Sequence, residues 1–206
     1  MYFYRWTVPN CPTVKYVLQS DDDGYVDTYH LGHFLSEQGF GGKEKFLLCA
    51  VLQNIHVRRS IEGPYSKWSV KPEDFPDETY ANFCSGHAYV TTIATIKDIL
   101  KVLKRMDSVI HIDDVVVTGM ATKGTGIPFF DLSHYFIGTH LQYRDELLES
   151  NNEFFTPELM IFFDIEPSDI TVLHKKFSWC RLNINKCYHL LWNNKHLDQM
   201  RRCEEF

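Results

Sequence analysis

The chain has 206 residues, of which 44% are hydrophobic and 15% aromatic, so it is long enough to form one domain with a sizeable core. Its formal net charge of -6 argues against nonspecific binding to a nucleic-acid backbone, and no nucleic-acid partner is expected. The sequence contains no apolar run of about 18 residues and begins without the apolar core of a signal peptide, so it predicts neither a transmembrane helix nor a secretion signal.

Apolar segments that alternate between strand-like and helical spacing predict an α/β fold. The clearest helix is 95–106, where apolar residues recur every three or four positions. In chain order, we expect a strand at 14–18, a helix at 26–37 closed by glycines, a β-like run at 45–52, turns at 60–76, a strand at 83–92, the helix at 95–106, a strand at 115–118, packed aromatic residues at 129–136, a polar surface connection at 146–157, strands at 159–163 and 170–173, and a terminal helix at 187–202.

Three consecutive aspartates, Asp21, Asp22 and Asp23, follow the first predicted strand. Adjacent carboxylates repel each other, and a divalent cation that also binds phosphate oxygens relieves this repulsion. The functional interpretation is a site for Mn²⁺ or Mg²⁺ in which Asp21 and Asp23 are ligands and a diphosphate completes the shell. The alternative is a solvated turn, because aspartate and the following Gly24 both favour turns.

A second acidic pair, Asp113 and Asp114, precedes the predicted strand at 115–118. One of these carboxylates can serve as a general base for an acceptor hydroxyl, and the neighbouring acid would raise its pKa. The alternative is a helix cap or a surface pair.

His174 is the most informative of the ten histidines, because it follows the predicted strand at 170–173. A neutral imidazole at a strand end would complete a metal shell, whereas the alternative is an ordinary exposed or hydrogen-bonded side chain. His134 and His140 are weaker candidates for the same role. In the strand predicted at 83–92, Gly86 marks a point where the backbone approaches either a sugar ring or a packed neighbour.

Four sequence blocks occur in the order typical of one enzyme family. They are Trp6 with Cys11–Asp23, Lys67–Val70 followed by Phe75 and Pro76, Tyr80–Val90, and Ile112–Val115. These blocks resemble, respectively, the segment leading into a DxD motif, the KW-x-V and YP pieces, the Y-x-x-Y-C-S-G-x-x-Y-V signature and the E/D-D-V block of the β1,3-galactosyltransferase and N-acetylglucosaminyltransferase superfamily. Members of this superfamily are family 31 glycosyltransferases, related to Fringe, and the resemblance covers residues 6–120.

The resemblance implies a GT-A fold, in which a mixed sheet is flanked by helices. It also implies a UDP-sugar donor and an inverting hexosyltransferase reaction with one base and no covalent enzyme intermediate. Galactose or N-acetylglucosamine would be transferred to an acceptor glycan on protein or lipid, in a β1,3 linkage and with Mn²⁺ or Mg²⁺ as cofactor. The lumenal face of the Golgi membrane is the location that the resemblance implies.

The resemblance also implies roles for individual residues. For the metal, Asp23 is expected to be a ligand with Asp21 and Asp22 in support, and His174, near the end of the chain, is expected to be a second protein ligand. Asp114 is expected to be the base, with Asp113 supporting it or replacing it. The residues expected around the donor are Asp21, Asp22, Ser85 and Gly86. A disulfide between Cys11 and Cys84 would connect the first and third blocks.

Three departures from the family pattern are visible. The interval from Asp114 to Gly119 is one residue longer than the common spacing, with Thr118 intervening, and a one-residue slip in a strand would turn the base to the opposite face. The family usually has Val-Phe-Val-Asn after the aspartates, where this chain has Gly24, Tyr25, Val26 and Asp27. The chain also begins just before the DxD motif, so we expect 1–206 to be a single partial catalytic domain without the membrane anchor and the first nucleotide-binding strands.

Two other functions fit parts of the sequence. Asp21, Asp23 and Gly24 match the DxDG motif of haloacid dehalogenase-type phosphatases, although Tyr25 stands where that motif expects threonine or valine. The phosphatase interpretation leaves the block at 80–90 unexplained. The last alternative is an inactive remnant of a glycosyltransferase.

Overall fold

A computed structural model describes residues 2–138, 148 and 160–183 and divides the chain into two compact units. Unit 1 consists of Met1–Ser20 and Gly39–Ser133, and unit 2 of Asp21–Gln38 and His134–Phe206. The terminal helix predicted at 187–202 lies outside the described residues, as does the connection at 146–157 apart from Leu148. No helix in the described part of the chain is long and apolar enough to cross a bilayer.

Unit 1 is built on a four-stranded mixed sheet with the order β1 (Val17–Ser20), β4 (Phe83–Thr91), β3 (Leu47–Leu52) and β5 (Phe129–Asp131). The long strand β4 is antiparallel to both of its neighbours, with Thr91 opposite Val17 on one side and Leu47 on the other. Strand β5 is parallel to β3. These strands confirm the predicted β segments at 45–52 and 83–92, while the strand expected at 14–18 begins at Val17.

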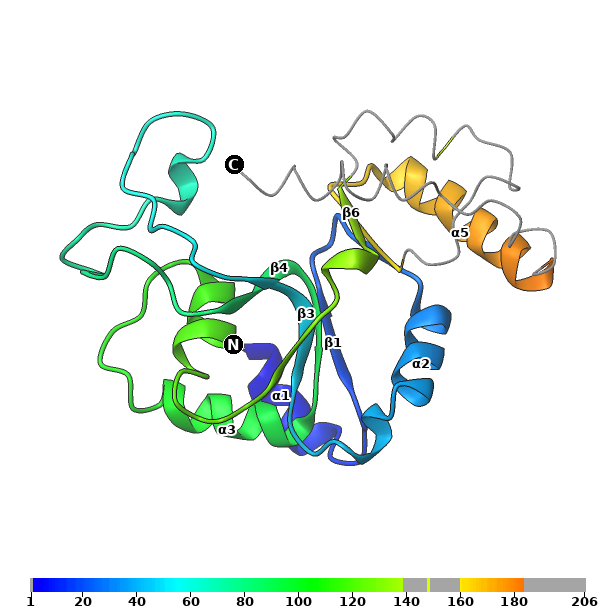
Figure 1. The fold of residues 1–206 in the computed structure, drawn as a ribbon, viewed down its shortest axis with the longest axis horizontal. Coiled ribbons are helices and arrows are strands. Elements are labelled where there is room, and N and C mark those ends of the chain that lie inside the picture. The colour runs from blue at the N-terminus through cyan, green and yellow to red at the C-terminus, as the bar shows by residue number, and fades with distance from the viewer. Residues whose placement is uncertain (1, 139–147, 149–159, 184–206) are drawn as a thin grey trace. The chain divides into compact units, whose positions relative to one another are not determined.

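Two helices, α1 (Tyr2–Asn10) and α3 (Ile93–Leu103), pack together beside this sheet (Figure 1). The side chain of Thr92 caps α3 by accepting a hydrogen bond from the amide of Thr95, and for this reason the helix begins two residues before the predicted position. Its residues Ile93, Ile96 and Ile99 are buried, as the helical spacing predicts. Helix α1 was not predicted, because it buries only Tyr4 and Thr7 and carries no periodic apolar stripe.

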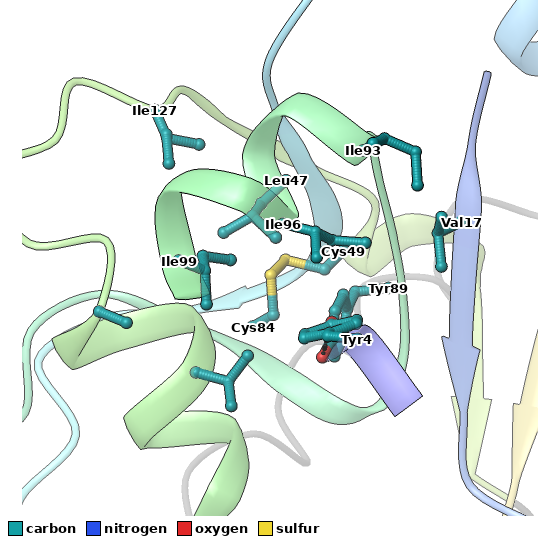
Figure 2. Packing of buried hydrophobic residues seen from close by; sticks show 12 residues of the cluster. Tyr4, Val17, Leu47, Cys49, Cys84, Tyr89, Ile93, Ile96, Ile99 and Ile127 are labelled. Atoms are coloured by element: carbon teal, nitrogen blue, oxygen red, sulfur yellow. Dashed lines mark hydrogen bonds between the residues drawn. A yellow bond between two sulfur atoms is a disulfide. The ribbon is translucent and has the colours of Figure 1, made fainter. Parts of the chain in front are cut away.

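A disulfide between Cys49 of β3 and Cys84 of β4 lies in the main core of unit 1. Figure 2 shows this bond surrounded by the side chains of Tyr4, Ile96 and Ile99. The hydroxyl of Tyr4 is hydrogen-bonded to that of Tyr89, and burial is the main cause that raises the pKa of Tyr4. The expected bridge between Cys11 and Cys84 is therefore wrong, because Cys84 is joined to its neighbouring strand and Cys11 is a free thiol.

Unit 2 contains a three-stranded mixed sheet with the order β2 (Tyr25–Val26), β7 (Ile161–Phe163) and β6 (Phe136–Gly138). Strand β7 is antiparallel to β2 and parallel to β6, and it confirms the late strand predicted at 159–163. The helices of this unit are α2 (Thr28–Glu37), close to its predicted range, and α5 (Pro167–Leu182). Short helices complete the described chain: η1 (Phe40–Gly42), η2 (Ser66–Trp68) and η4 (Ser133–Tyr135) are 3₁₀ turns, and η3 (Val115–Met120) is π-helical.

The strand predicted at 170–173 is wrong, because this segment lies inside α5. Pro167 suits the first helical position and Asp169 lies in the first turn, where a negative charge favours a helix N-terminus. Leu173 and Phe177, four residues apart, are buried together against Tyr25 and Phe162. The apolar run is therefore one stripe of a helix rather than a buried strand.

A buried aspartate connects the beginning of α2 with the end of α5. Asp27 is 3% exposed, and its carboxylate accepts hydrogen bonds from the amides of Tyr29 and His30 at the N-terminus of α2. The guanidinium of Arg181 donates to the same oxygen at 2.9 Å. The carboxylate therefore satisfies two helix donors and neutralises a largely buried cation.

Replacing Cys49 with serine should lower the free energy of unfolding by about 3–4 kcal/mol, because the bond closes a loop between residues 35 positions apart and restricts the unfolded chain. Urea unfolding of oxidised protein measures this loss. Cys11→Ser is the matched control and should change stability by less than about 0.5 kcal/mol. The pairing is contradicted if Cys11→Ser, and not Cys49→Ser, makes Cys84 available to alkylation in a mass-spectrometric peptide map.

Replacing Asp27 with alanine should destabilise unit 2 by about 2–4 kcal/mol, because α2 loses its cap and Arg181 loses its carboxylate. Asp27→Asn keeps an oxygen for the cap and removes only the charge, so it should lose less. Urea unfolding combined with hydrogen exchange of α2 peptides separates the two effects. Equal losses in both variants would show that the charge, and not the cap, is what matters.

Candidate functional site

The three aspartates of unit 2 form an exposed turn between β1 and β2. The amide of Gly24 donates to the carbonyl of Asp21 at 3.3 Å, which closes the turn. The carbonyl of Asp23 accepts the amide of Ile165 at 2.9 Å, so the turn is also attached to the segment between β7 and α5. The side chains of Asp21, Asp22 and Asp23 thus lie on the surface of a turn whose backbone is held in place.

His174 is exposed in the middle of α5, so the prediction that it lies at a strand end is wrong. Its Nδ1 atom is 3.4 Å from the hydroxyl of Tyr25, two residues after Asp23. Tyr25 is buried and stacks on Phe177, with ring centroids 5.6 Å apart. Burial raises the pKa of Tyr25 to about 12, with Asp27 raising it further and Arg181 opposing. The imidazole is therefore supported by a neutral phenol whose ring is fixed in the core of unit 2.

The chemistry of these donors fits a hard divalent cation only in an open site. Among the described residues, no group of three or more His, Cys, Asp or Glu side chains is arranged to hold a metal ion. Carboxylate oxygens and an imidazole are nevertheless ligands that Mn²⁺ and Mg²⁺ accept, and such ions commonly keep positions for water and phosphate oxygens. Of the weaker candidates, His134 is exposed in η4, and His140 lies outside the described residues.

The acidic pair of unit 1 lies at the start of a helix. Asp113 is exposed, whereas Asp114 is half-buried and its carboxylate accepts the amide of Val115 at 2.7 Å. Partial burial is the main cause that raises the pKa of Asp114 above 3.8, its usual value, and the charge of Asp113 adds to it. The amides of Val115 and Gly86 favour the charged form and oppose the shift. We expected the neighbouring acid to raise this pKa, and it does, but burial contributes more.

Gly86 of β4 lies directly beside the Asp114 carboxylate. A Cβ atom at position 86 would be 3.3 Å from Oδ2 of Asp114, closer than side chains normally approach each other. The glycine therefore leaves room for the carboxylate, which agrees with the expectation that the backbone approaches something at this point. The adjacent Ser85 is buried in the same strand. Sequence reasoning assigned Gly86 and Asp114 to one site, and the structure brings them together within unit 1.

The strand predicted at 115–118 is wrong, because these residues belong to the π-helix η3. The amide of Ala121 donates to the carbonyl of Val116, five residues back, at 2.9 Å. Val115, Val116 and Val117 are buried, but in a helix they point around the axis instead of alternating between two faces. The extra residue before Gly119 therefore widens a helical turn and does not reverse the faces of a strand.

Tyr80 has a buried hydroxyl that the sequence does not predict. Its ring packs between Phe75 and Phe83, and its side chain is 7% exposed. The hydroxyl is buried and has no hydrogen-bond partner among the described residues. Burial raises the pKa of Tyr80, and the charge of Asp114 raises it further. Tyr80 belongs to the family-like block at 80–90, but the residues of this block do not indicate that its hydroxyl is buried.

The block at 67–70 begins with the exposed residues Lys67 and Trp68 and ends with the buried Val70, and it is connected to the acidic pair. The rings of Tyr65 and Trp68 are stacked 5.7 Å apart and are 46% and 42% exposed. His111, two residues before Asp113, is hydrogen-bonded through Nε2 to the carbonyl of Lys67 at 2.9 Å. This contact places the block next to the segment that carries the candidate base.

Comparison with known proteins assigns the chain to a family. A family model described as galactosyltransferase matches residues 1–133. The chain belongs to the galactosyltransferase family. The matched residues of this galactosyltransferase-family chain include the aspartates at 21–23, Gly86 and Asp114, whereas His174 lies beyond them.

Curated relatives agree with the family. β-1,3-Galactosyltransferase 2 of Mus musculus is 30% identical over 116 residues, which are 55% of this chain and 26% of the relative. The Homo sapiens protein of the same name is 29% identical over the same shares. β-1,3-Galactosyltransferase 1 of Mus musculus is 26% identical over 131 residues, 64% of this chain and 38% of the relative. The galactosyltransferase-family chain thus spans between 26% and 38% of the length of these relatives.

Proposed function

We propose that the chain provides the catalytic part of a metal-dependent, inverting hexosyltransferase. Galactose or N-acetylglucosamine would pass from a UDP-sugar to a hydroxyl of an acceptor glycan on protein or lipid, in a β1,3 linkage. The observation that carries this proposal is the half-buried carboxylate of Asp114, held beside Gly86 and raised in pKa. The names of the relatives support the transfer of galactose in a β-1,3 linkage over the alternatives.

Asp114 has the properties that a general base for this reaction needs. Its carboxylate is partly accessible, so an acceptor hydroxyl can reach it, and its raised pKa makes it a stronger base than an exposed aspartate. The hydroxyl oxygen attacks the anomeric carbon from the face opposite UDP while Asp114 takes the hydroxyl proton. The bond to the diphosphate breaks with its electrons, and UDP leaves. Asp113, exposed and one residue earlier, is the alternative base.

Asp23 and His174 would hold Mn²⁺ or Mg²⁺, with Asp21 and Asp22 in support. When bound, the cation neutralises the negative charge of the departing diphosphate. The exposed carboxylates and the attached backbone of this turn support the assignment, because the substrate diphosphate must be able to reach the site. In the tautomer in which Nδ1–H of His174 donates to the hydroxyl oxygen of Tyr25, the Nε2 lone pair would be left for the cation.

The disulfide of unit 1 supports a location in an oxidising compartment. Cys49 and Cys84 are both 0% exposed, and such bonds persist where thiols are not kept reduced. The Golgi lumen, which the family resemblance implies, meets this condition. Any attachment to the membrane would require a segment other than the helices described here.

Replacing Asp114 with asparagine in the intact protein should lower kcat by about 10²–10⁴, because proton transfer in the transition state is lost. The KM for the donor should change by less than about tenfold, because the side chain keeps its size and one oxygen. UDP release from UDP-galactose and from UDP-N-acetylglucosamine measures both constants. Asp113→Asn is the matched control, and a larger loss in this variant than in Asp114→Asn would reassign the base.

The wild-type pH profile gives a second measurement on the same residue. The base must be deprotonated to act, and its pKa is raised, so kcat should fall as the pH drops through a value above 3.8, the usual aspartate pKa. This acid limb should be absent from the residual activity of Asp114→Asn.

Replacing Asp23 with alanine should abolish metal-dependent transfer and weaken Mn²⁺ binding, because the cation loses a charged ligand. Electron paramagnetic resonance of Mn²⁺ in the presence of UDP measures binding without turnover, and His174→Ala should weaken it by about 10–100-fold. Asp74→Ala, at an exposed aspartate of unit 1, is the control and should leave binding unchanged. Undiminished transfer by Asp23→Ala in a chelator would refute the metal site.

A further inference from the structure

Thr118 connects the helix that follows the candidate base to the central strand of unit 1. Its side chain is completely buried, and its hydroxyl makes two hydrogen bonds at once. The hydroxyl donates to the carbonyl of Asp114 at 2.7 Å and accepts from the amide of Cys84 at 2.9 Å. One oxygen atom therefore joins the residue that carries the base to the backbone of β4, two residues before Gly86.

The helical turn that follows Asp114 is wider than an α turn. The helix η3 is π-helical, and the amide of Ala121 donates to the carbonyl of Val116, five residues back, at 2.9 Å. Gly119 packs closely against β4, because a Cβ atom there would lie 3.0 Å from the Cβ of Phe83. The turn is thus fixed at Gly119 by close packing and at Thr118 by hydrogen bonds, and Asp114 begins it.

We propose that Thr118 is a positioning residue, whose hydroxyl holds Asp114 beside Gly86 despite the wider turn. This inference rests on the proposed function, in which Asp114 is the base. A π-helical turn contains more residues than an α-helical turn. Hydrogen bonds within η3 therefore do not by themselves determine which part of β4 lies beside Asp114. The hydrogen bond between the Cys84 amide and the Thr118 hydroxyl fixes the position of η3 on β4, because Cys84 is itself fixed in the core by its disulfide.

Loss of the hydroxyl has a defined physical result. Thr118→Val keeps the shape of the side chain but leaves the amide of Cys84 and the carbonyl of Asp114 without this partner in a buried position. The turn can then shift to find other partners, and the carboxylate shifts with it. Displacement of a reacting group by about 1 Å can lower a rate by about 10²-fold while substrate binding is little affected.

Thr122, in the turn that follows η3, offers a matched control. Its hydroxyl is also buried and donates to backbone carbonyls one turn back, those of Thr118 and Gly119. It has no hydrogen bond to β4 or to Asp114 among the contacts of the described residues. Thr122→Val therefore removes a comparable hydrogen bond without touching the connection between the helix and the strand.

The experiment compares Thr118→Val, Thr118→Ser and Thr122→Val in the intact protein. We expect Thr118→Val to lower kcat by about 10–100-fold with donor and acceptor KM values within about threefold. Thr118→Ser should restore kcat to within about threefold of wild type, because serine keeps both hydrogen bonds. Thr122→Val should keep the wild-type kcat. Equal kcat values for the two valine variants, or no recovery with serine, would overturn the inference.

A second measurement does not depend on transferase activity. The amide of Gly86 interacts with the carboxylate of Asp114, so its hydrogen exchange reports whether the two remain together. Thr118→Val should speed exchange at Gly86 and Cys84 by about tenfold or more, and Thr122→Val should not. If wild-type protein transfers no sugar from either donor, the proposed function fails, and the exchange comparison still decides the role of Thr118. Unchanged exchange at Gly86 in Thr118→Val would refute it.

Discussion

The close crossing of η3 over β4 is the contact on which the candidate base depends. Cys84 lies at its centre, because its side chain is bonded to Cys49 in the core and its amide is bonded to Thr118 in the helix. Gly119 brings the helix backbone against Phe83, and Gly86 leaves space for the carboxylate of Asp114. The strand therefore fixes the helix, and the helix start fixes the carboxylate, through contacts that all lie within unit 1.

Backbone hydrogen bonds hold the acidic turn of unit 2 in place. Its three carboxylates are exposed, and their negative charges repel each other weakly in water, so they do not stabilise the turn. Order comes from the backbone on either side, where the carbonyl of Asp23 accepts from Ile165 and the amide of Asp27 donates to Met160. Asp27 adds a buried negative charge that Arg181 neutralises. The backbone of the turn is thus attached to the rest of unit 2, while its three carboxylates remain exposed.

The sequence predicted those elements whose side chains repeat with a clear period. Helix α3 has a full apolar stripe, and β3 and β4 are long enough to be recognised as buried strands. The runs at 115–118 and 170–173 contain too few residues to distinguish a strand from one side of a helix, and in each a helical start at Asp114 or Pro167 decided the outcome. The pairing of Cys49 with Cys84 depends on strands adjacent in space, which spacing along the chain does not reveal.

The candidate site was predictable to a similar degree. The residue types at 21–23 and 113–114 indicated their chemistry. The family resemblance assigned both Asp114 and Gly86 to the site, and the structure brings these two residues side by side. Neither source indicated that Thr118 would bond to Cys84 or that the hydroxyl of Tyr80 would be buried without a partner among the described residues. Both features depend on which atoms meet once the helix and the strand have packed.

The contact between Gly119 and Phe83 also limits how this part of the chain can vary in length. A Cβ atom at the crossing would meet the Cβ of Phe83 at 3.0 Å, so any residue other than glycine would push the helix and the strand apart. An insertion or deletion between Asp114 and the crossing would therefore place a side chain against Phe83 unless a glycine still reached that point. The length of η3 and the position of its glycine are thus constrained together by a single contact with β4.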